Sequence, residues 1–212
     1  QCNPLMETTK FIIIGGGGHA RVVSSIIEAQ KTSHLEAVFD SNPKIETLDK
    51  VKNFHDYKPD LFPNALAIIA IGDNSVRKQL VQTIHHVFGV LIHPSASIDR
   101  PSLVGAGTVV MHHAVIQRGT VIGKHVIINT ACSVDHDCIL GDFVHIAPNA
   151  TLCGGVQIGD ETFIGAGAVV LPQIKIGKRV TLGAGTVVTK SIPDGATVVG
   201  NPGKIINSHG AI

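Results

Sequence analysis

Large aromatic side chains are scarce in this sequence, which has no tryptophan, one tyrosine and seven phenylalanines among 212 residues. Hydrophobic residues nevertheless reach 44% of the chain, supplied largely by Ile, Val and Leu. A core without large rings suits narrow, regular packing better than an ordinary globular interior. Charge is sparse as well: the net charge is +1, and no run of Lys and Arg occurs. Nucleic acid and anionic membranes are therefore not expected as main partners.

Long hydrophobic runs and paired cysteines are missing too. The longest apolar runs, such as residues 65–71, are too short to span a bilayer. Residues 1–10 are polar, so no signal peptide is expected, and Met6 is a candidate native start after five residues left from expression. The four cysteines show no CxxC spacing, which predicts a reducing, cytoplasmic environment. They are Cys2, Cys132, Cys138 and Cys153.

The first half of the chain alternates predicted strands with predicted helices. Helices are expected at residues 20–31, after a glycine turn, and at residues 75–86. The alternation predicts a small parallel α/β domain over residues 10–91, preceded by a disordered segment at residues 1–9. Four strands amount to about half of a dinucleotide-binding fold. They are expected at residues 10–14, 37–39, 66–71 and 87–92.

The second half, residues 92–193, follows a six-residue repeat. It divides into 17 hexapeptides without a gap, and every hexapeptide begins with Ile, Leu or Val, from Ile92 to Val188. A period of six does not match an amphipathic helix, but it fits a short strand followed by a corner. Three such units close a triangular coil of 18 residues, so the repeat predicts a parallel β-helix of between five and six coils. Residues 194–212 are expected to form a C-terminal tail.

Two positions of the repeat have structural explanations. One corner is repeatedly glycine at an 18-residue spacing, and we expect glycine there to relieve the positive φ of a tight turn. The fifth position of each hexapeptide is small or β-branched, and Cys132 and Cys138 fill it. Both cysteines are expected to be inert core thiols. The corner glycines are Gly105, Gly123, Gly141, Gly159 and Gly177.

Several segments together resemble one family of enzymes. They are IIIGGGGHA, IAIGDNSVR, INTACSVDHDCILGDFVHIAPNATLCGG, two GAG corners and VVGNPGK. From residue 10 to residue 206 the chain is similar to hexapeptide-repeat sugar acetyltransferases of the bacillosamine pathway and to their sialic-acid O-acetyltransferase relatives. The resemblance implies a left-handed β-helix and a homotrimer with acetyl-CoA between neighbouring β-helices. It also implies N-acetylation of a nucleotide-linked amino sugar, of the UDP-4-amino-4,6-dideoxy type.

The segment VDHDC carries the candidate acetyl-transfer chemistry. His136 is the best candidate for a general base, because imidazole titrates near neutral pH and carboxylates flank it. The resemblance makes Asp137 the acidic residue that tunes His136. Gly154 lies 18 residues further on, one coil above the same corner, and is the candidate oxyanion donor. By resemblance, His145 contacts acetyl-CoA, and the backbone at Ala166 and Ala184, in the GAG corners, contacts its pantetheine arm.

The N-terminal glycine turn is a candidate phosphate site. Residues 15–20 fit G-x-G-x-x-A between a strand and a helix, where backbone N–H groups and the helix dipole hold phosphate. NAD is disfavoured because half of the dinucleotide fold is missing. The resemblance places a nucleotide-sugar diphosphate there instead. Gly17, Gly18 and His19 would lie at its phosphate end, Asp40 nearer its base and Gly72 in the neighbouring loop.

Three other functions stay open on the residues alone. The first is O-acetylation of a sialic-type sugar, with His136 deprotonating a hydroxyl. The second is a metal-dependent β-helix hydrase, which needs three histidines converging on zinc; His113, His136 and His145 are available, but their spacing does not match paired ligands. The third is a non-catalytic nucleotide-sugar binder. The preferred hypothesis requires no metal and no covalent enzyme intermediate.

Overall fold

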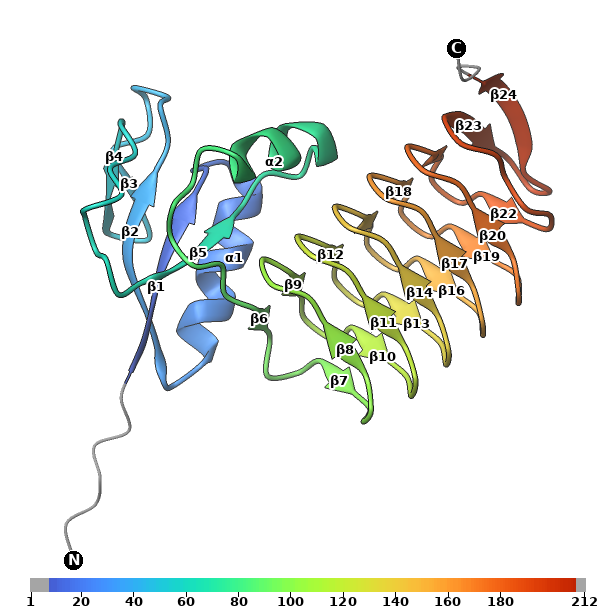
Figure 1. Ribbon diagram of the computed structural model, residues 1–212, viewed down its shortest axis with the longest axis horizontal. Coiled ribbons are helices and arrows are strands. Elements are labelled where there is room, and N and C mark those ends of the chain that lie inside the picture. Colours follow the sequence, from blue (N-terminus) through green and yellow to red (C-terminus); the bar gives the residue numbers. More distant parts are fainter. Residues whose placement is uncertain (1–7, 209–212) are drawn as a thin grey trace, which may run out of the picture.

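The computed structural model describes residues 8–208, which form an α/β part followed by a long β-helix (Figure 1). The expectations for Met6, for Cys2 and for a disordered start therefore lie outside the described residues, except that Thr9 already begins a strand. The first sheet has the strand order β3-β4-β2-β1-β5. Its strands are β1 (Thr9–Ile14), β2 (Ser33–Phe39), β3 (Thr47–Leu48), β4 (Val51–Phe54) and β5 (Leu66–Ile69).

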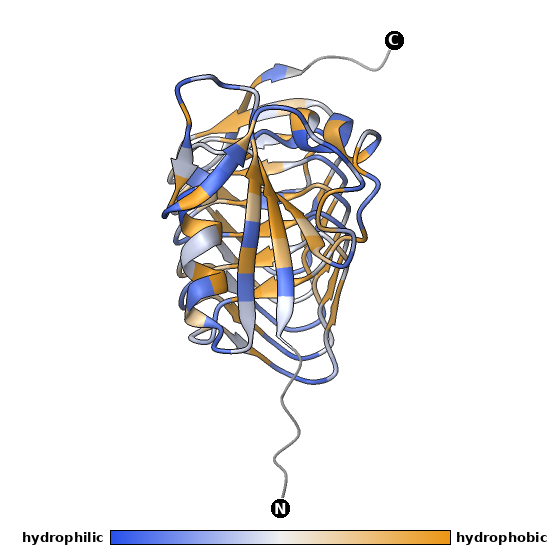
Figure 2. Cartoon of the chain, turned by 90° about the vertical axis from the view of Figure 1, so that its left-hand side faces the viewer, coloured by the Kyte–Doolittle hydropathy of each residue, from blue (hydrophilic) through white to orange (hydrophobic). Residues whose placement is uncertain are grey.

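The first sheet is covered on both faces. Strand β1, which lies between β2 and β5, is apolar along its second half and buried from Phe11 onward, as expected for a parallel strand between two layers (Figure 2). One face packs on α1 (Gly18–Ala29) together with outward-facing residues of the β-helix, including Met111 and Ile127. The other face packs against the region of α2 (Asn74–Val81). The two parts of the chain thus share one apolar layer.

The α/β part differs most from the sequence-based expectation in three places, besides β2 beginning at Ser33 instead of residue 37 and α1 spanning Gly18–Ala29 instead of residues 20–31. A β3–β4 antiparallel hairpin was not expected; its two turn residues, Asp49 and Lys50, both have positive φ, as a two-residue hairpin requires. Helix α2 ends at Val81 instead of residue 86, because the Tyr57 hydroxyl accepts hydrogen bonds from the backbone N–H groups of His85 and His86. The strand expected at residues 87–92 is reduced to one parallel bridge between Phe88 and Ala67 of β5 and to Leu91–Ile92, which belongs to the β-helix.

The β-helix is left-handed and has three parallel sheets, in which the strands from β6 to β22 pair with strands 18 residues away. The β6 sheet contains β6 (Leu91–Ile92), β9 (Val109–Val110), β12 (Ile127–Ile128), β15 (His145–Ile146), β18 (Phe163–Ile164), β21 (Thr181–Leu182), β23 (Ala196–Val199) and the antiparallel β24 (Lys204–Ser208). The β7 sheet contains β7 (Ser97–Ile98), β10 (Val115–Ile116), β13 (Ser133–Val134), β16 (Thr151–Leu152), β19 (Val169–Val170) and β22 (Val187–Val188). The β8 sheet contains β8 (Leu103–Val104), β11 (Val121–Ile122), β14 (Ile139–Leu140), β17 (Gln157–Ile158) and β20 (Lys175–Ile176).

The interior of the β-helix is one continuous column. First-position residues from Val110 to Val188 are buried in it, and so are the fifth-position thiols Cys132 and Cys138. Burial raises the pKa of Cys132 to about 12 and that of Cys138 to about 11, so both thiols stay protonated, as expected for core residues. The part expected to be a C-terminal tail instead contains β23 and β24, which extend the β6 sheet.

The expected reason for the corner glycines is wrong. Positive φ occurs at the fourth residue of the hexapeptides from 107 to 185, and nine of those residues, including Asp137, are not glycine. Gly105 and its repeats lie two residues earlier, outside the left-handed region. A Cβ at Gly105 would lie 2.5 Å from the carbonyl oxygen of Gly123 in the next coil. Glycine is needed at this corner because successive coils approach too closely for a side chain.

Candidate functional site

The three sheets of the β-helix form a triangular prism. His136 and Asp137 lie on the edge of this prism where the chain passes from β13 in the β7 sheet to β14 in the β8 sheet. We call this the His136 edge. Asp137 has φ 58°, and this left-handed turn brings its carboxylate beside the preceding side chain. Its Oδ2 lies 2.9 Å from His136 Nδ1, and both side chains are exposed, at 56% for His136 and 74% for Asp137. Because a carboxylate accepts hydrogen bonds, Nδ1 carries the proton and Nε2 is left with a lone pair.

The electrostatics of the His136 edge favour a basic imidazole. The hydrogen bond that His136 Nδ1–H donates to Asp137 is the main cause that raises the pKa of His136 above its ordinary value, and the negative charge of Asp135 adds to it. Asp135 also accepts a hydrogen bond from the His136 backbone N–H at 2.7 Å. The two flanking carboxylates therefore act together, one on the ring and one on the backbone.

Gly154 lies directly over the His136 ring. A Cβ at this position would be 2.6 Å from Nε2, so only glycine leaves room for the imidazole in this position. The Gly154 carbonyl accepts the ladder hydrogen bond from Gln173, and the N–H of Gly155 bonds to the His136 carbonyl. Within the part of the chain that the structure describes, the Gly154 N–H has no acceptor, and the residue is buried beneath the imidazole.

Ala166 and Ala184 lie on a different edge, between the β6 sheet and the β7 sheet. The N–H of Gly185 donates to the Ala166 carbonyl, which stacks the two GAG corners in register. Among the described residues, no acceptor bonds to the N–H of either alanine. These two free N–H groups repeat along the axis of the β-helix, one coil apart.

His145 lies on the outer face of β15, where the α/β part meets the β6 sheet. Its Nδ1 is 3.1 Å from the Gly72 carbonyl oxygen, so Nδ1 must be the protonated nitrogen. Its Nε2 lies 3.2 Å from Nδ2 of Asn129 and accepts from that amide. Desolvation by burial is the main cause that lowers the pKa of His145 to about 4, and the ring is therefore neutral near pH 7.

The N-terminal glycine loop has the geometry of an anion site. Helix α1 begins at Gly18, its N-cap is Gly17, and no side chain caps it. A Cβ at Gly17 or Gly18 would meet open space, so no residue between 8 and 208 covers these two glycines. The uncapped N–H groups and the positive end of the helix dipole are available to a phosphate.

Of the two side chains expected to contact the ligand in the α/β part, Asp40 is engaged within the chain, whereas Nε2 of His19 is buried without a hydrogen-bond partner among the described residues. The Asp40 carboxylate accepts hydrogen bonds from the backbone N–H groups of Gly16 at 2.6 Å and Asn42 at 2.8 Å, so it holds the glycine loop in place. The His19 ring faces His145, with ring centroids 6.5 Å apart. Desolvation by burial, followed by the neighbouring His145, lowers the pKa of His19 to about 4.

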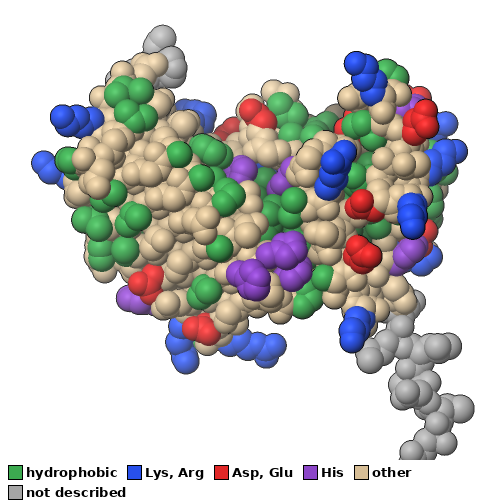
Figure 3. Space-filling model, turned by 180° about the vertical axis from the view of Figure 1, so that it is seen from behind, with side chains coloured by type: hydrophobic (Ala, Val, Ile, Leu, Met, Phe, Trp, Pro, Cys, Tyr) green, Lys and Arg blue, Asp and Glu red, His purple; other side chains and the backbone are tan. Residues whose placement is uncertain are grey.

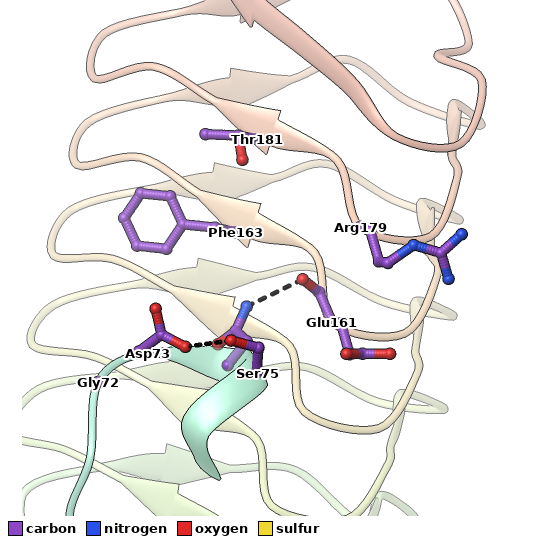
Figure 4. A pocket seen from close by; sticks show the side chains of 8 residues that line it. Gly72, Asp73, Ser75, Glu161, Phe163, Arg179 and Thr181 are labelled. Carbon is purple, nitrogen blue, oxygen red and sulfur yellow. Dashed lines mark hydrogen bonds between the residues drawn. The ribbon is translucent and has the colours of Figure 1, made fainter. Parts of the chain in front are cut away.

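A cleft of about 550 Å³ opens beside the expected Gly72 loop, between the start of α2 and the β6 sheet (Figure 4). Asp73 caps α2 by accepting from the Val76 N–H at 2.9 Å, and the Asn74 side chain donates to the Glu161 carbonyl at 3.0 Å. The cleft is lined by Gly72, Asp73, Asn74, Ser75, Glu161, Phe163, Arg179 and Thr181. Seen from behind, the molecule is hollowed between its two parts, and histidine side chains show in and beside the hollow (Figure 3).

Sequence reasoning did not single out Arg77 or Asn129. Arg77 is 1% exposed and bridges α2 to the β-helix, and Asn129 fixes the second nitrogen of His145. The available signal for Arg77 was its place in IAIGDNSVR, shortly after the loop that carries Gly72.

Within a single chain, the expected site residues lie on different sides of the β-helix. The glycine loop and His145 are next to the β6 sheet, whereas His136 is on the edge opposite that sheet. The three histidines of the zinc alternative do not converge either: His113 follows β9 on the edge between the β6 and β7 sheets. No group of three metal-ligating side chains occurs among residues 8–208. No helix in that same range is long and apolar enough to cross a membrane.

Comparisons with known proteins match both parts of the chain. Residues 10–84 match the PglD N-terminal domain family, and residues 155–190 match the bacterial transferase hexapeptide family, with six repeats. The acetyltransferase domain of PglB from Neisseria gonorrhoeae, solved with acetyl coenzyme A, is 37% identical with a TM-score of 0.86, over 94% of this chain and 100% of that one. The chain belongs to the hexapeptide-repeat sugar acetyltransferases.

Two further relatives of this family are similar to the chain. PerB from Caulobacter crescentus, solved with CoA and GDP-perosamine, is 37% identical with a TM-score of 0.86, over 94% of this chain and 97% of that one. The UDP-N-acetylbacillosamine N-acetyltransferase of Bacillus subtilis is 41% identical over 109 residues, or 47% of this chain. That match spans 50% of the length of the curated relative.

Proposed function

We propose that this member of the family transfers the acetyl group of acetyl-CoA to the amine of a nucleotide-linked amino sugar, with His136 as general base. The observation that carries the proposal is the arrangement on the His136 edge. Nε2 of an imidazole held by Asp137 lies over the Cα of Gly154, whose N–H has no hydrogen-bond partner among the described residues. The relatives support the substrate class, because PerB is bound to GDP-perosamine and the Bacillus subtilis relative is named for UDP-N-acetylbacillosamine.

The proposed reaction is a direct attack. Nε2 of His136 takes a proton from the sugar amine as the nitrogen attacks the thioester carbonyl carbon. The Gly154 N–H donates to the oxyanion, and its collapse expels the CoA thiolate, which is protonated by the imidazolium. No cysteine is needed as a nucleophile, and the core thiols Cys132 and Cys138 are buried and protonated.

We further propose that the active site is shared between copies in a homotrimer. In one chain the β-helix separates the candidate phosphate loop at residues 15–20 from His136. A neighbouring copy that places its β6 sheet toward the His136 edge brings nucleotide sugar and base together. The free N–H groups of Ala166 and Ala184 would then line the path of the pantetheine arm.

The test is release of free thiol from acetyl-CoA with three acceptors: a UDP-4-amino-4,6-dideoxy sugar, GDP-perosamine and a sialic-type sugar with hydroxyls. His136→Ala is compared with His34→Ala, which removes an exposed histidine of β2 far from the proposed chemistry. We expect release with one of the amino sugars that falls by about 100-fold or more in His136→Ala, the usual contribution of a general base, and is unchanged in His34→Ala. Release with the hydroxyl acceptor alone, or equal rates in both variants, would reject the proposal.

A further inference from the structure

The largest fully buried side chain of the described residues is a cation, Arg77. Burying a charge is costly unless every donor is satisfied, so such a residue calls for an explanation. None of the described carboxylates forms an ion pair with Arg77. Its guanidinium is bonded instead to neutral oxygens, and burial lowers its pKa to about 10, which leaves it charged at neutral pH.

The oxygens bound by Arg77 come from both parts of the chain. On the β-helix, Nε donates to the His125 carbonyl at 2.8 Å and Nη2 to the Phe143 carbonyl at 2.9 Å, which belong to successive coils. On the α/β side, Nη1 donates to the carbonyls of Ile71 at 3.0 Å and Gly72 at 3.3 Å. Nη2 also donates to the Asn74 side-chain oxygen at 2.7 Å. One planar group thus fixes the loop 71–74 against two coils.

The same loop reaches the candidate site. The Gly72 carbonyl that Arg77 binds is also the acceptor for Nδ1–H of His145. This contact commits the proton of the neutral ring to Nδ1 and makes Nε2 an acceptor. That lone pair accepts from the Asn129 side-chain amide at 3.2 Å, so both ring nitrogens of His145 are engaged within the chain and the ring is held in one orientation.

We propose that Arg77 is a positioning residue, which seats the Gly72 carbonyl against His145 and so fixes both the tautomer of His145 and the wall of the adjoining cleft. The kinetic part of this proposal rests on the proposed acetyl transfer; the structural part does not. His136 lies on the opposite edge of the prism, so Arg77 acts on ligand binding and leaves the chemical step largely intact.

The experiment uses the full chain with Arg77→Met, which keeps the apolar volume and removes all five donors, and Arg77→Lys, which keeps the charge and has three donors. The matched control is Lys78→Met on the same helix. Lys78 also links the two parts of the chain, through an ion pair of 2.6 Å with Glu161, but it is half exposed. The Glu161 side chain is only 14% exposed, so Lys78→Met tests whether losing another link between the two parts of the chain has the same effects as losing Arg77.

The first readout is the tautomer of His145, from the nitrogen chemical shifts of histidine-labelled protein at neutral pH. We expect a single Nδ1–H form in the unchanged protein and in Lys78→Met, and a mixture in Arg77→Met. The second readout is kinetic: KM for both substrates rises about 10-fold or more while kcat changes less than about threefold, because charge-assisted contacts to the loop are lost.

An unaltered His145 tautomer together with unaltered KM in folded Arg77→Met would overturn the proposal. Should that variant fail to fold, Arg77→Lys decides by the same two readouts, since it retains a cation and part of the network. If the tautomer changes but even the unchanged protein releases no thiol with any acceptor, the positioning role stands and the proposed function falls.

Discussion

The Gly154→Ala substitution adds one methyl group directly over the His136 imidazole. The new Cβ would lie 2.6 Å from Nε2 and 2.7 Å from Cε1, whereas ordinary van der Waals contact begins at 3.4 Å. The tip of the ring must therefore move by about 0.8 Å, and a displacement of about 1 Å at a reacting group can cost about 100-fold in rate. The backbone N–H stays in place, so the substitution tests the position of the base and spares the candidate oxyanion donor.

The fold should tolerate this change. The His136 side chain is 56% exposed and can swing outward without disturbing the core. We expect kcat/KM in the thiol-release assay to fall about 100-fold, with a melting temperature within a few degrees of the unchanged protein. Gly123→Ala is the contrasting variant, because its Cβ would meet the backbone of Gly141 and should lower the melting temperature.

A double-mutant cycle tests whether Gly154→Ala lowers the rate by displacing the His136 ring. In the His136→Ala background there is no ring to displace, so adding Gly154→Ala should lower the rate no further. Activity of Gly154→Ala within about twofold of the unchanged protein would show that the Nε2 position over Gly154 is not the one used in catalysis, and would refute the reasoning.

Two predictions concern pH. Asp137→Asn removes the main cause of the raised His136 pKa, so the acid limb of the pH profile of kcat, where the base becomes protonated, should move to lower pH. The plateau should fall by about 10-fold or more, and Asp135→Asn should shift the acid limb less. An acid limb that does not move in Asp137→Asn would contradict the assignment of His136 as the base. His19 and His145 have pKa values lowered to about 4 from 6.5, so their contribution to stability is complete above pH 6.5 and is lost as pH falls from 6.5 towards 4. Urea midpoints between pH 7 and pH 4.5 should show this loss, and the double variant His19→Gln/His145→Gln should show less of it; an equal loss would contradict the prediction.

The β-helix was predictable because its six-residue sequence pattern is local and repeated. Every coil meets residues of the same type 18 positions away, so the rule that buries Val134 also buries Leu152. The alignment of His136 with Gly154 follows from the same spacing and is confirmed, since the absent Cβ of Gly154 would fall on the imidazole. The prediction of a helix to residue 86 failed because the hydroxyl of Tyr57, 28 residues before His85, bonds to the backbone there.

The sequence by itself therefore determined the β-helix, its core positions and the candidate base, because these depend on the period of the chain. Tertiary structure decided what depends on distant, unrepeated contacts. Asp40 supports the glycine loop from 24 residues away, and Arg77 reaches carbonyls 48 and 66 residues away. A buried charge has to find whichever oxygens the folded chain places around it. No pattern along the sequence specifies which oxygens Arg77 binds, because they come together only when the two parts of the chain pack against each other.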